Sequence, residues 1–74
     1  MSEQTLDTRG LSCPLPVLKA RKRLQGMRPG ERLTVLATDP KAPDDLRVFC
    51  EEAGHRLAES GEEAGAYRLV VERG

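Results

Sequence analysis

The chain has 74 residues, with 12 basic and 12 acidic side chains, no tryptophan, one tyrosine and one phenylalanine. This length predicts one domain, residues 1–74, with a thin core of leucine, valine and alanine, because a chain of about 60 residues buries only ~60% of its unfolded surface. The balanced charge argues against a dedicated nucleic-acid binder, and the small core argues against a large internal substrate cavity.

The first ten residues are polar and lack the apolar segment of a signal peptide. No apolar run approaches the ~20 residues that a membrane-spanning helix needs. We therefore expect a monomeric cytoplasmic protein without membrane association, whose two cysteines are free thiols rather than a disulfide.

A short strand, a helix and a second strand are predicted first. The strand candidate is QTLD, residues 4–7. Apolar residues then recur within a stripe of about 80°, as an amphipathic helix requires. They are Val17, Ala20, Leu24 and Met27. Gly26 and the Arg-Pro-Gly sequence at 28–30 end this helix, and residues 32–37 alternate as a strand.

A second helix and two further strands follow. Asp39 and the acidic pair after Pro43, Asp44 and Asp45, are helix N-terminal signals. Capping and dipole interactions explain Asp39 and Asp45, and contact with a partner is the alternative. The apolar stripe of this helix consists of Leu46, Phe49, Cys50 and Ala53. Gly54 suits the position after its last turn. Residues 55–60 and 66–73 are strands joined by a short turn, GEEAG.

The order β-α-β-α-β-β predicts an α/β (α+β) two-layer sandwich. Two helices cannot cover both faces of so small a sheet, so they should share one face and leave the other to solvent. Right-handed crossovers favour parallel pairing in the first units, and the short final turn makes the last two strands an antiparallel hairpin. The sheet is therefore four-stranded and mixed.

Cys13 stands directly before a Pro-Leu-Pro sequence at the predicted start of the first helix. With Cys13 as N-cap, Pro14 and Pro16 fall at N1 and N3, where the backbone N–H has no partner within the helix. They support the helix start and leave the Leu15 N–H as the main free donor near the sulfur. The helix dipole and nearby basic side chains should then favour thiolate over thiol.

The segments TLDTRGLSCPLPVLKARK (5–22) and MRPGERLTVLATDPKAPDDLRVFCEEAGHRL (27–57) resemble the TusA/SirA-like sulfur carrier proteins with their C-P-x-P motif. The resemblance covers the chain from Thr5 to about Val71 and implies the same two-layer fold. Ser12 stands where some members have an arginine.

The resemblance implies that Cys13 carries sulfane sulfur as a persulfide, so that the protein is a sulfurtransferase-type carrier with a covalent intermediate. The implied donor is a pyridoxal-phosphate cysteine desulfurase or a rhodanese. Implied acceptors are relay proteins toward 2-thiouridine in tRNA, sulfur oxidation enzymes or molybdenum cofactor pathways. The pyridoxal phosphate belongs to the donor, so we expect no cofactor in this chain.

Two other functions remain open, namely a thiol redox sensor and a regulatory interaction module without sulfur transfer. The redox alternative requires Cys50 to reach Cys13, but Cys50 lies within an apolar stripe, where a free cysteine acts as a small buried hydrophobe. His55 is expected to be structural, and no metal site is expected without C-x-x-C or paired histidines.

Exposed apolar and basic residues of the first helix form a candidate partner-docking surface. Leu15 lies about 160° from Val17 around a helix of 100° per residue, and Leu18 lies beyond the edge of the apolar stripe. Four basic residues accompany them: Lys19, Arg21, Lys22 and Arg23. These six residues are either an ordinary solvated face or a surface for acidic protein partners. Direct nucleic-acid contact is not expected, because no aromatic side chains interleave with the basic ones.

Overall fold

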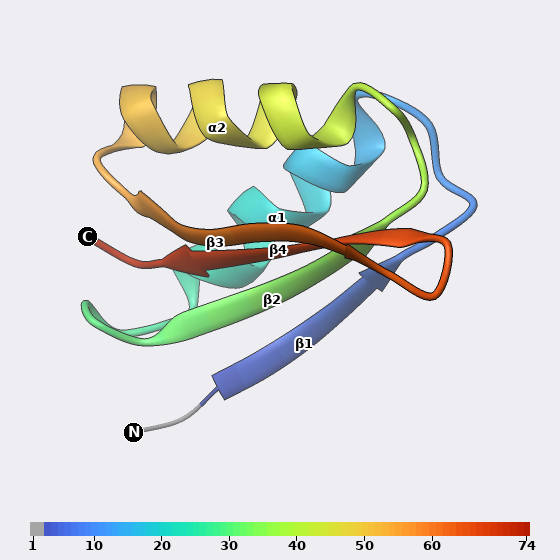
Figure 1. The fold of residues 1–74 in the computed structure, drawn as a ribbon. Helices are drawn as coiled ribbons and strands as arrows, with labels where there is room; N and C mark the ends of the chain where they lie inside the picture. The colour runs from blue at the N-terminus through green and yellow to red at the C-terminus, as the bar shows by residue number, and fades with distance from the viewer. Residues whose placement is uncertain (1–2) are drawn as a thin grey trace.

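A computed structural model describes residues 3–74, and its element order is the predicted β-α-β-α-β-β (Figure 1). The elements are β1 (Glu3–Thr8), α1 (Leu15–Gln25), β2 (Arg32–Ala37), α2 (Ala42–Ala53), β3 (Arg56–Glu63) and β4 (Ala66–Glu72). The strand β3 is longer than predicted, because its pairing with β4 continues to the turn after a register shift between Leu57 and Glu59.

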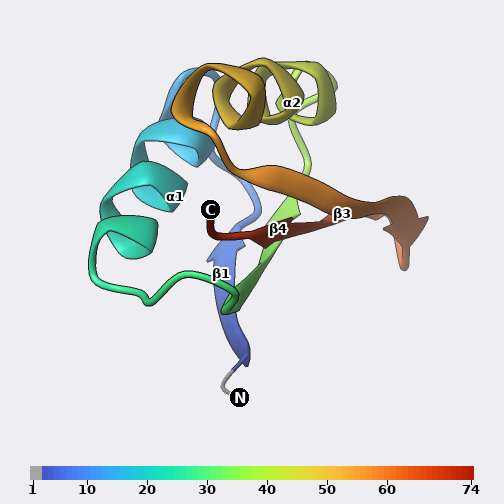
Figure 2. The same ribbon diagram turned by 90° about the vertical axis from the view of Figure 1, so that its left-hand side faces the viewer.

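The four strands form one mixed sheet in the order β1-β2-β4-β3. β1 and β2 are parallel, whereas β4 pairs antiparallel with both β2 and β3. Both helices lie on the same side of this sheet, as Figure 2 shows. The predicted two-layer sandwich is therefore confirmed.

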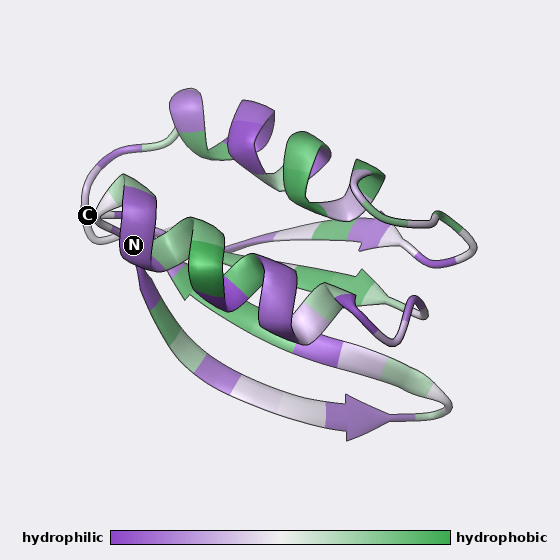
Figure 3. Cartoon of the chain, turned by 90° about the horizontal axis from the view of Figure 1, so that it is seen from above, coloured by the Kyte–Doolittle hydropathy of each residue, from purple (hydrophilic) through white to green (hydrophobic). Residues whose placement is uncertain are grey.

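The core lies between the helices and the two central strands. Leucine, valine, alanine and methionine side chains from every layer fill it, together with one cysteine. They are Ala20, Leu24, Met27, Leu33, Val35, Leu46, Cys50, Leu69 and Val71. Figure 3 shows this pattern as hydrophobic residues in the central strands and alternating hydrophobic and hydrophilic turns in the helices. Val17 and Phe49 are only partly buried.

One residue of the predicted α2 stripe, Ala53, is exposed. It belongs to the last turn of α2, after which the chain turns toward the sheet and begins β3 at Arg56. Gly54 follows it with a φ of 80°, in the left-handed region, and its N–H bonds to the carbonyl of Cys50. The predicted helix end at Gly54 is thus confirmed, because glycine adopts this conformation without steric cost.

The face of the sheet away from the helices is less open to solvent than predicted. Thr34 and Val70 are paired on this face and are 9% and 1% exposed. Long charged side chains on the same face of the sheet surround them. Among these, Arg32 forms an ion pair with Glu72 at 3.4 Å. A second pair, Arg68 with Glu59, lies at 3.1 Å. Side chains of this length bury apolar area with their stems while their charged ends remain in water.

Within residues 3–74, neither helix has the length and apolar character needed to cross a membrane.

Candidate functional site

Cys13 lies in the loop that joins β1 to α1, and its side chain is exposed. The helix begins at Leu15, with Pro14 as the N-cap, so Cys13 lies one position before the cap and not at it as predicted. The reason is a turn closed by the Leu15 N–H, which donates to the Ser12 carbonyl at 2.9 Å. The Cys13–Pro14 peptide bond inside this turn is cis.

This turn changes the role expected of the Leu15 N–H but not that of the prolines. The Leu15 N–H already has a partner and is not a free donor near the sulfur, so that expectation was wrong. Pro14 and Pro16 still occupy positions that need no N–H, since the first helical bond runs from Leu18 N–H to the Pro14 carbonyl at 3.1 Å. They start the helix directly behind the cysteine, as predicted.

The Cys13 loop lies beside the loop between β2 and α2, because the two preceding strands are parallel neighbours. Thr8 and Ala37, the last residues of these strands, are paired. Hydrogen bonds of two threonine side chains also join the two segments, in addition to the backbone hydrogen bonds of the sheet. The Thr8 hydroxyl donates to the Leu36 carbonyl at 2.6 Å, and the Gly10 N–H donates to the Thr38 hydroxyl at 2.9 Å.

Two aspartates from the α2 side hold Cys13. The Asp39 carboxylate accepts the backbone N–H of Cys13, and it also accepts the N–H of Lys41 at 2.9 Å. The Asp45 carboxylate accepts the thiol proton of Cys13, with Sγ and Oδ2 2.8 Å apart. Asp39 thus accepts the backbone N–H of the N-cap residue Lys41, and Asp45 lies in the first turn of α2 as predicted. The contacts of both aspartates with Cys13 were not predicted.

The hydrogen bond that the thiol donates to Asp45 raises the pKa of Cys13, and desolvation and the charges of Asp45 and Asp39 act in the same direction. Lys41 is the basic group that opposes them. A thiolate here would face a carboxylate at hydrogen-bond distance, so the protonated form is favoured. This contradicts the sequence-based expectation of an acidic thiol, which considered the helix terminus and the basic residues but not α2.

The two leucines predicted to face solvent do so. Leu15 is 42% exposed and Leu18 is 50% exposed, whereas Ala20 and Leu24 on the same helix are buried. The helical phase deduced from the sequence is therefore confirmed. Val48 on α2 is a further exposed apolar residue, which the sequence reading did not single out.

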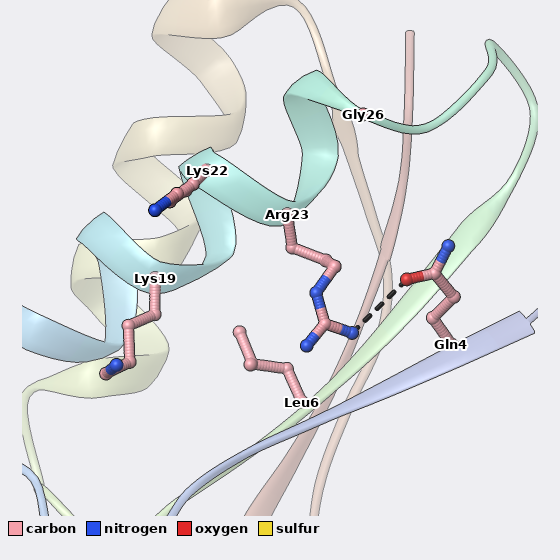
Figure 4. A pocket seen from close by; sticks show the side chains of 6 residues that line it. All are labelled: Gln4, Leu6, Lys19, Lys22, Arg23 and Gly26. Carbon is pink, nitrogen blue, oxygen red and sulfur yellow. Dashed lines mark hydrogen bonds between the residues drawn. The ribbon is translucent and has the colours of Figure 1, made fainter.

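The four basic residues of α1 fall on two sides of the helix. Three of them line an open groove of about 470 Å³ between α1 and β1, with Leu6 and Gln4 on its other wall (Figure 4). These are Lys19, Lys22 and Arg23. Arg23 donates to the Gln4 side-chain oxygen at 3.2 Å. Arg21 instead lines a smaller hollow of about 140 Å³ with Phe49 and His55. The four basic residues of α1 therefore belong to two separate hollows of the surface.

A comparison with protein-family models decides the family. The model described as sulfurtransferase TusA matches residues 4–73. The chain belongs to the TusA family.

Relatives in this family are similar over nearly their whole length. A provisionally named sulfur carrier protein of Neisseria meningitidis is 50% identical over 72 residues, which is 97% of each chain. The sulfur carrier protein TusA of Allochromatium vinosum is 42% identical over 71 residues, 96% of this chain and 93% of the relative. A crystal structure of a SirA-like protein from Desulfitobacterium hafniense superposes with a TM-score of 0.83 at 27% identity, over 96% of this chain and 97% of that one.

The second cysteine of this TusA-family chain lies inside the core. Cys50 is 2% exposed, and burial raises the pKa of its thiol to about 11. Both cysteines are free. Cys50 therefore acts as the small buried hydrophobe that the sequence predicted. His55 packs on Phe49 with ring centroids 5.6 Å apart, and its Nδ1 accepts the N–H of Gly74 at 3.0 Å. No group of three or more candidate ligands for a metal ion occurs among residues 3–74.

Sequence reasoning placed the sulfur but missed the residues that contact it. A signal for Asp39 was present, because the predicted parallel pairing of the first two strands brings the loops after them to one edge of the sheet. The contact with Asp45 had no comparable signal, since it joins residues 32 positions apart and depends on how α2 crosses the sheet.

Proposed function

We propose that this protein is a sulfur carrier that holds sulfane sulfur as a persulfide on Cys13. The observation that carries the proposal is an exposed cysteine in a hydrogen-bonded turn, in a chain whose relatives are named as sulfur carriers. Persulfide transfer needs direct contact between two sulfur atoms. A thiol at the tip of a small domain can make this contact, whereas the buried Cys50 cannot.

The transfer is a displacement between sulfur atoms. The Cys13 thiolate attacks the outer sulfur of a persulfide on the donor, and the sulfur–sulfur bond of the donor breaks. The electron pair of that bond leaves with the donor's sulfur, which becomes a thiolate. The acceptor thiolate later attacks the persulfide on Cys13 in the same way, so no external oxidant or reductant is consumed.

The proposed donor is a cysteine desulfurase or a rhodanese, and the proposed acceptor is a downstream protein of a sulfur relay, such as the one toward 2-thiouridine in tRNA. The chemistry needs no cofactor on this chain. We place the protein in the cytoplasm, as a monomer without direct nucleic-acid or membrane contact.

Partner docking is proposed for the exposed residues of α1 that follow Cys13. Leu15 and Leu18 supply an apolar centre within about one turn of the motif, as in interfaces with an apolar core and a polar rim. The groove with Lys19, Lys22 and Arg23 supplies positive charge on one side of this centre, and Arg21 supplies it on the other. Such charges orient acidic partners and accelerate their association.

The test is sulfur loading followed by intact-mass measurement. The wild-type protein is incubated with a cysteine desulfurase and cysteine, or with a rhodanese and thiosulfate, and the gain of one sulfur atom is measured. We expect Cys13→Ala to gain none and Cys50→Ala to load as the wild type does. Equal loading of both variants, or no loading of the wild type by either class of donor, would overturn the proposal. A disulfide between Cys13 and Cys50 in place of loading would support the redox alternative.

A further inference from the structure

The sulfur of Cys13 is held from the α2 side by a group that the transfer chemistry just described does not use. Asp45 Oδ2 lies 2.8 Å from Sγ, and Asp39 binds the backbone N–H of the same residue. A carboxylate can only accept hydrogen bonds, so the contact with Sγ exists only while the sulfur carries a proton. The contact therefore depends on the chemical state of Cys13.

We propose that Asp45 is a positioning residue that holds the empty Cys13 thiol against α2 and releases the sulfur once it is loaded. This inference rests on the proposed function. It assigns Asp45 the task of distinguishing the empty carrier from the loaded one.

The distinction follows from the proton balance of loading. Cys13–SH releases its proton to solvent, and the thiolate attacks the outer sulfur of the donor persulfide R–S–SH. The products are Cys13–S–SH and the donor thiolate R–S⁻, which takes up a proton from solvent. A persulfide is a stronger acid than a thiol, because its inner sulfur stabilises the charge on the outer one. The loaded sulfur is thus an anion at neutral pH, and the Asp45 carboxylate repels it.

Release from Asp45 has a consequence for transfer. In the empty state the sulfur lies against α2, where the hydrogen bond to Asp45 keeps the thiol protonated. A protonated thiol is a poor nucleophile. In the loaded state the outer sulfur turns away from the carboxylate toward solvent, where an acceptor can attack it. The carrier is thus least reactive when it has nothing to deliver.

The other charged groups that face Cys13 do not replace Asp45. Asp39 acts on the thiol in the same direction, but its oxygens bind backbone N–H groups of Cys13 and Lys41. Lys41 acts in the opposite direction. The first turn of α1 contains no charged side chain, and Arg9 in the preceding loop pairs with Asp7 at 2.8 Å. Among these groups, Asp45 is the one in contact with Sγ.

The first measurement is the titration of the empty thiol in a Cys50→Ala background. Alkylation rates are followed against pH for the parent and for Asp45→Asn, which keeps the shape of the side chain and removes its charge. We expect the midpoint to fall, because removing the charge and the acceptor of Asp45 no longer favours the protonated thiol. The thiolate fraction at neutral pH then rises. Since the nucleophilicity of a thiolate falls with its pKa, we expect the alkylation rate at neutral pH to rise only about threefold.

The second measurement repeats the alkylation with the loaded protein, prepared chemically with inorganic polysulfide. We expect the loaded parent and the loaded Asp45→Asn protein to react at the same rate, because the contact no longer exists. Asp44→Asn is the matched control, since Asp44 is an exposed carboxylate in the same turn of α2. It should leave both measurements unchanged.

An unchanged midpoint in Asp45→Asn, or a loaded form that responds as strongly as the empty one, would overturn the inference. If Asp45→Asn does not fold, the titration of the wild-type protein decides, with ¹³C labels in Cys13 and Asp45. The ¹³C signal of the Asp45 carboxylate should respond as the Cys13 thiol of the empty protein loses its proton, and this response should be absent after loading. These measurements are independent of donor enzymes, so failure of enzymatic loading would overturn the proposed function without deciding the role of Asp45.

Discussion

Replacing Leu15 with serine should separate partner docking from folding. The side chain is 42% exposed, so the free protein buries only part of it. Complete burial of a leucine is worth about 1.5–3 kcal/mol, and we expect Leu15→Ser to lower the free energy of unfolding by about 1 kcal/mol or less. Leu24 on the same helix is 1% exposed, and Leu24→Ala should cost about 2–5 kcal/mol because it leaves a cavity in the core.

The assay combines urea unfolding with the rate of sulfur transfer from the donor and to the acceptor. Leu15→Ser should fold and lose transfer rate with at least one partner, whereas Leu15→Met, which keeps an apolar side chain, should retain it. A loss of stability in Leu15→Ser as large as that of Leu24→Ala would show that the side chain belongs to the core. Normal transfer with both partners would show that Leu15 has no part in docking.

Three further predictions concern stability and pH. The pKa of Cys50 is raised in the folded protein to about 11, so its stabilising effect is present below the ordinary thiol pKa and is lost as pH rises from about 9 to 11; alkaline unfolding curves of Cys50→Ala should lack this step. Hydrogen bonds from the N–H groups of Lys41 and Cys13 lower the pKa of Asp39, so its contribution is present above about pH 4 and is lost as pH falls. Acid unfolding of Asp39→Ala should be less steep there, and the Cys13 amide should exchange hydrogen faster. Gly54→Ala should destabilise the protein by about 1 kcal/mol, because alanine is strained at a φ of 80°; a stability equal to the wild type in urea would contradict this.

Local patterns in the sequence predicted most of the fold. The apolar spacing of α1 identified its buried face and the exposure of Leu15 and Leu18, since side chains three and four apart share one face of a helix. Gly54 marked the end of α2, and the order of elements predicted helices on one face of a mixed sheet. The errors in predicted burial lie at the ends of elements, as for Ala53 in the last turn of α2. At such a position, burial depends on the path of the chain segments that lie next to it in the folded protein.

The candidate site divides in the same way. The Cys-Pro-Leu-Pro sequence determined by itself that an exposed cysteine stands before a helix, because proline is tolerated only at the start of one. It did not determine the protonation of the sulfur. That depends on Asp45, 32 residues away, and on the crossing of α2 over the sheet, which places a carboxylate 2.8 Å from Sγ. Electrostatic effects at this distance act through space, so only the tertiary structure could decide whether the helix terminus or the carboxylate sets the state of the thiol.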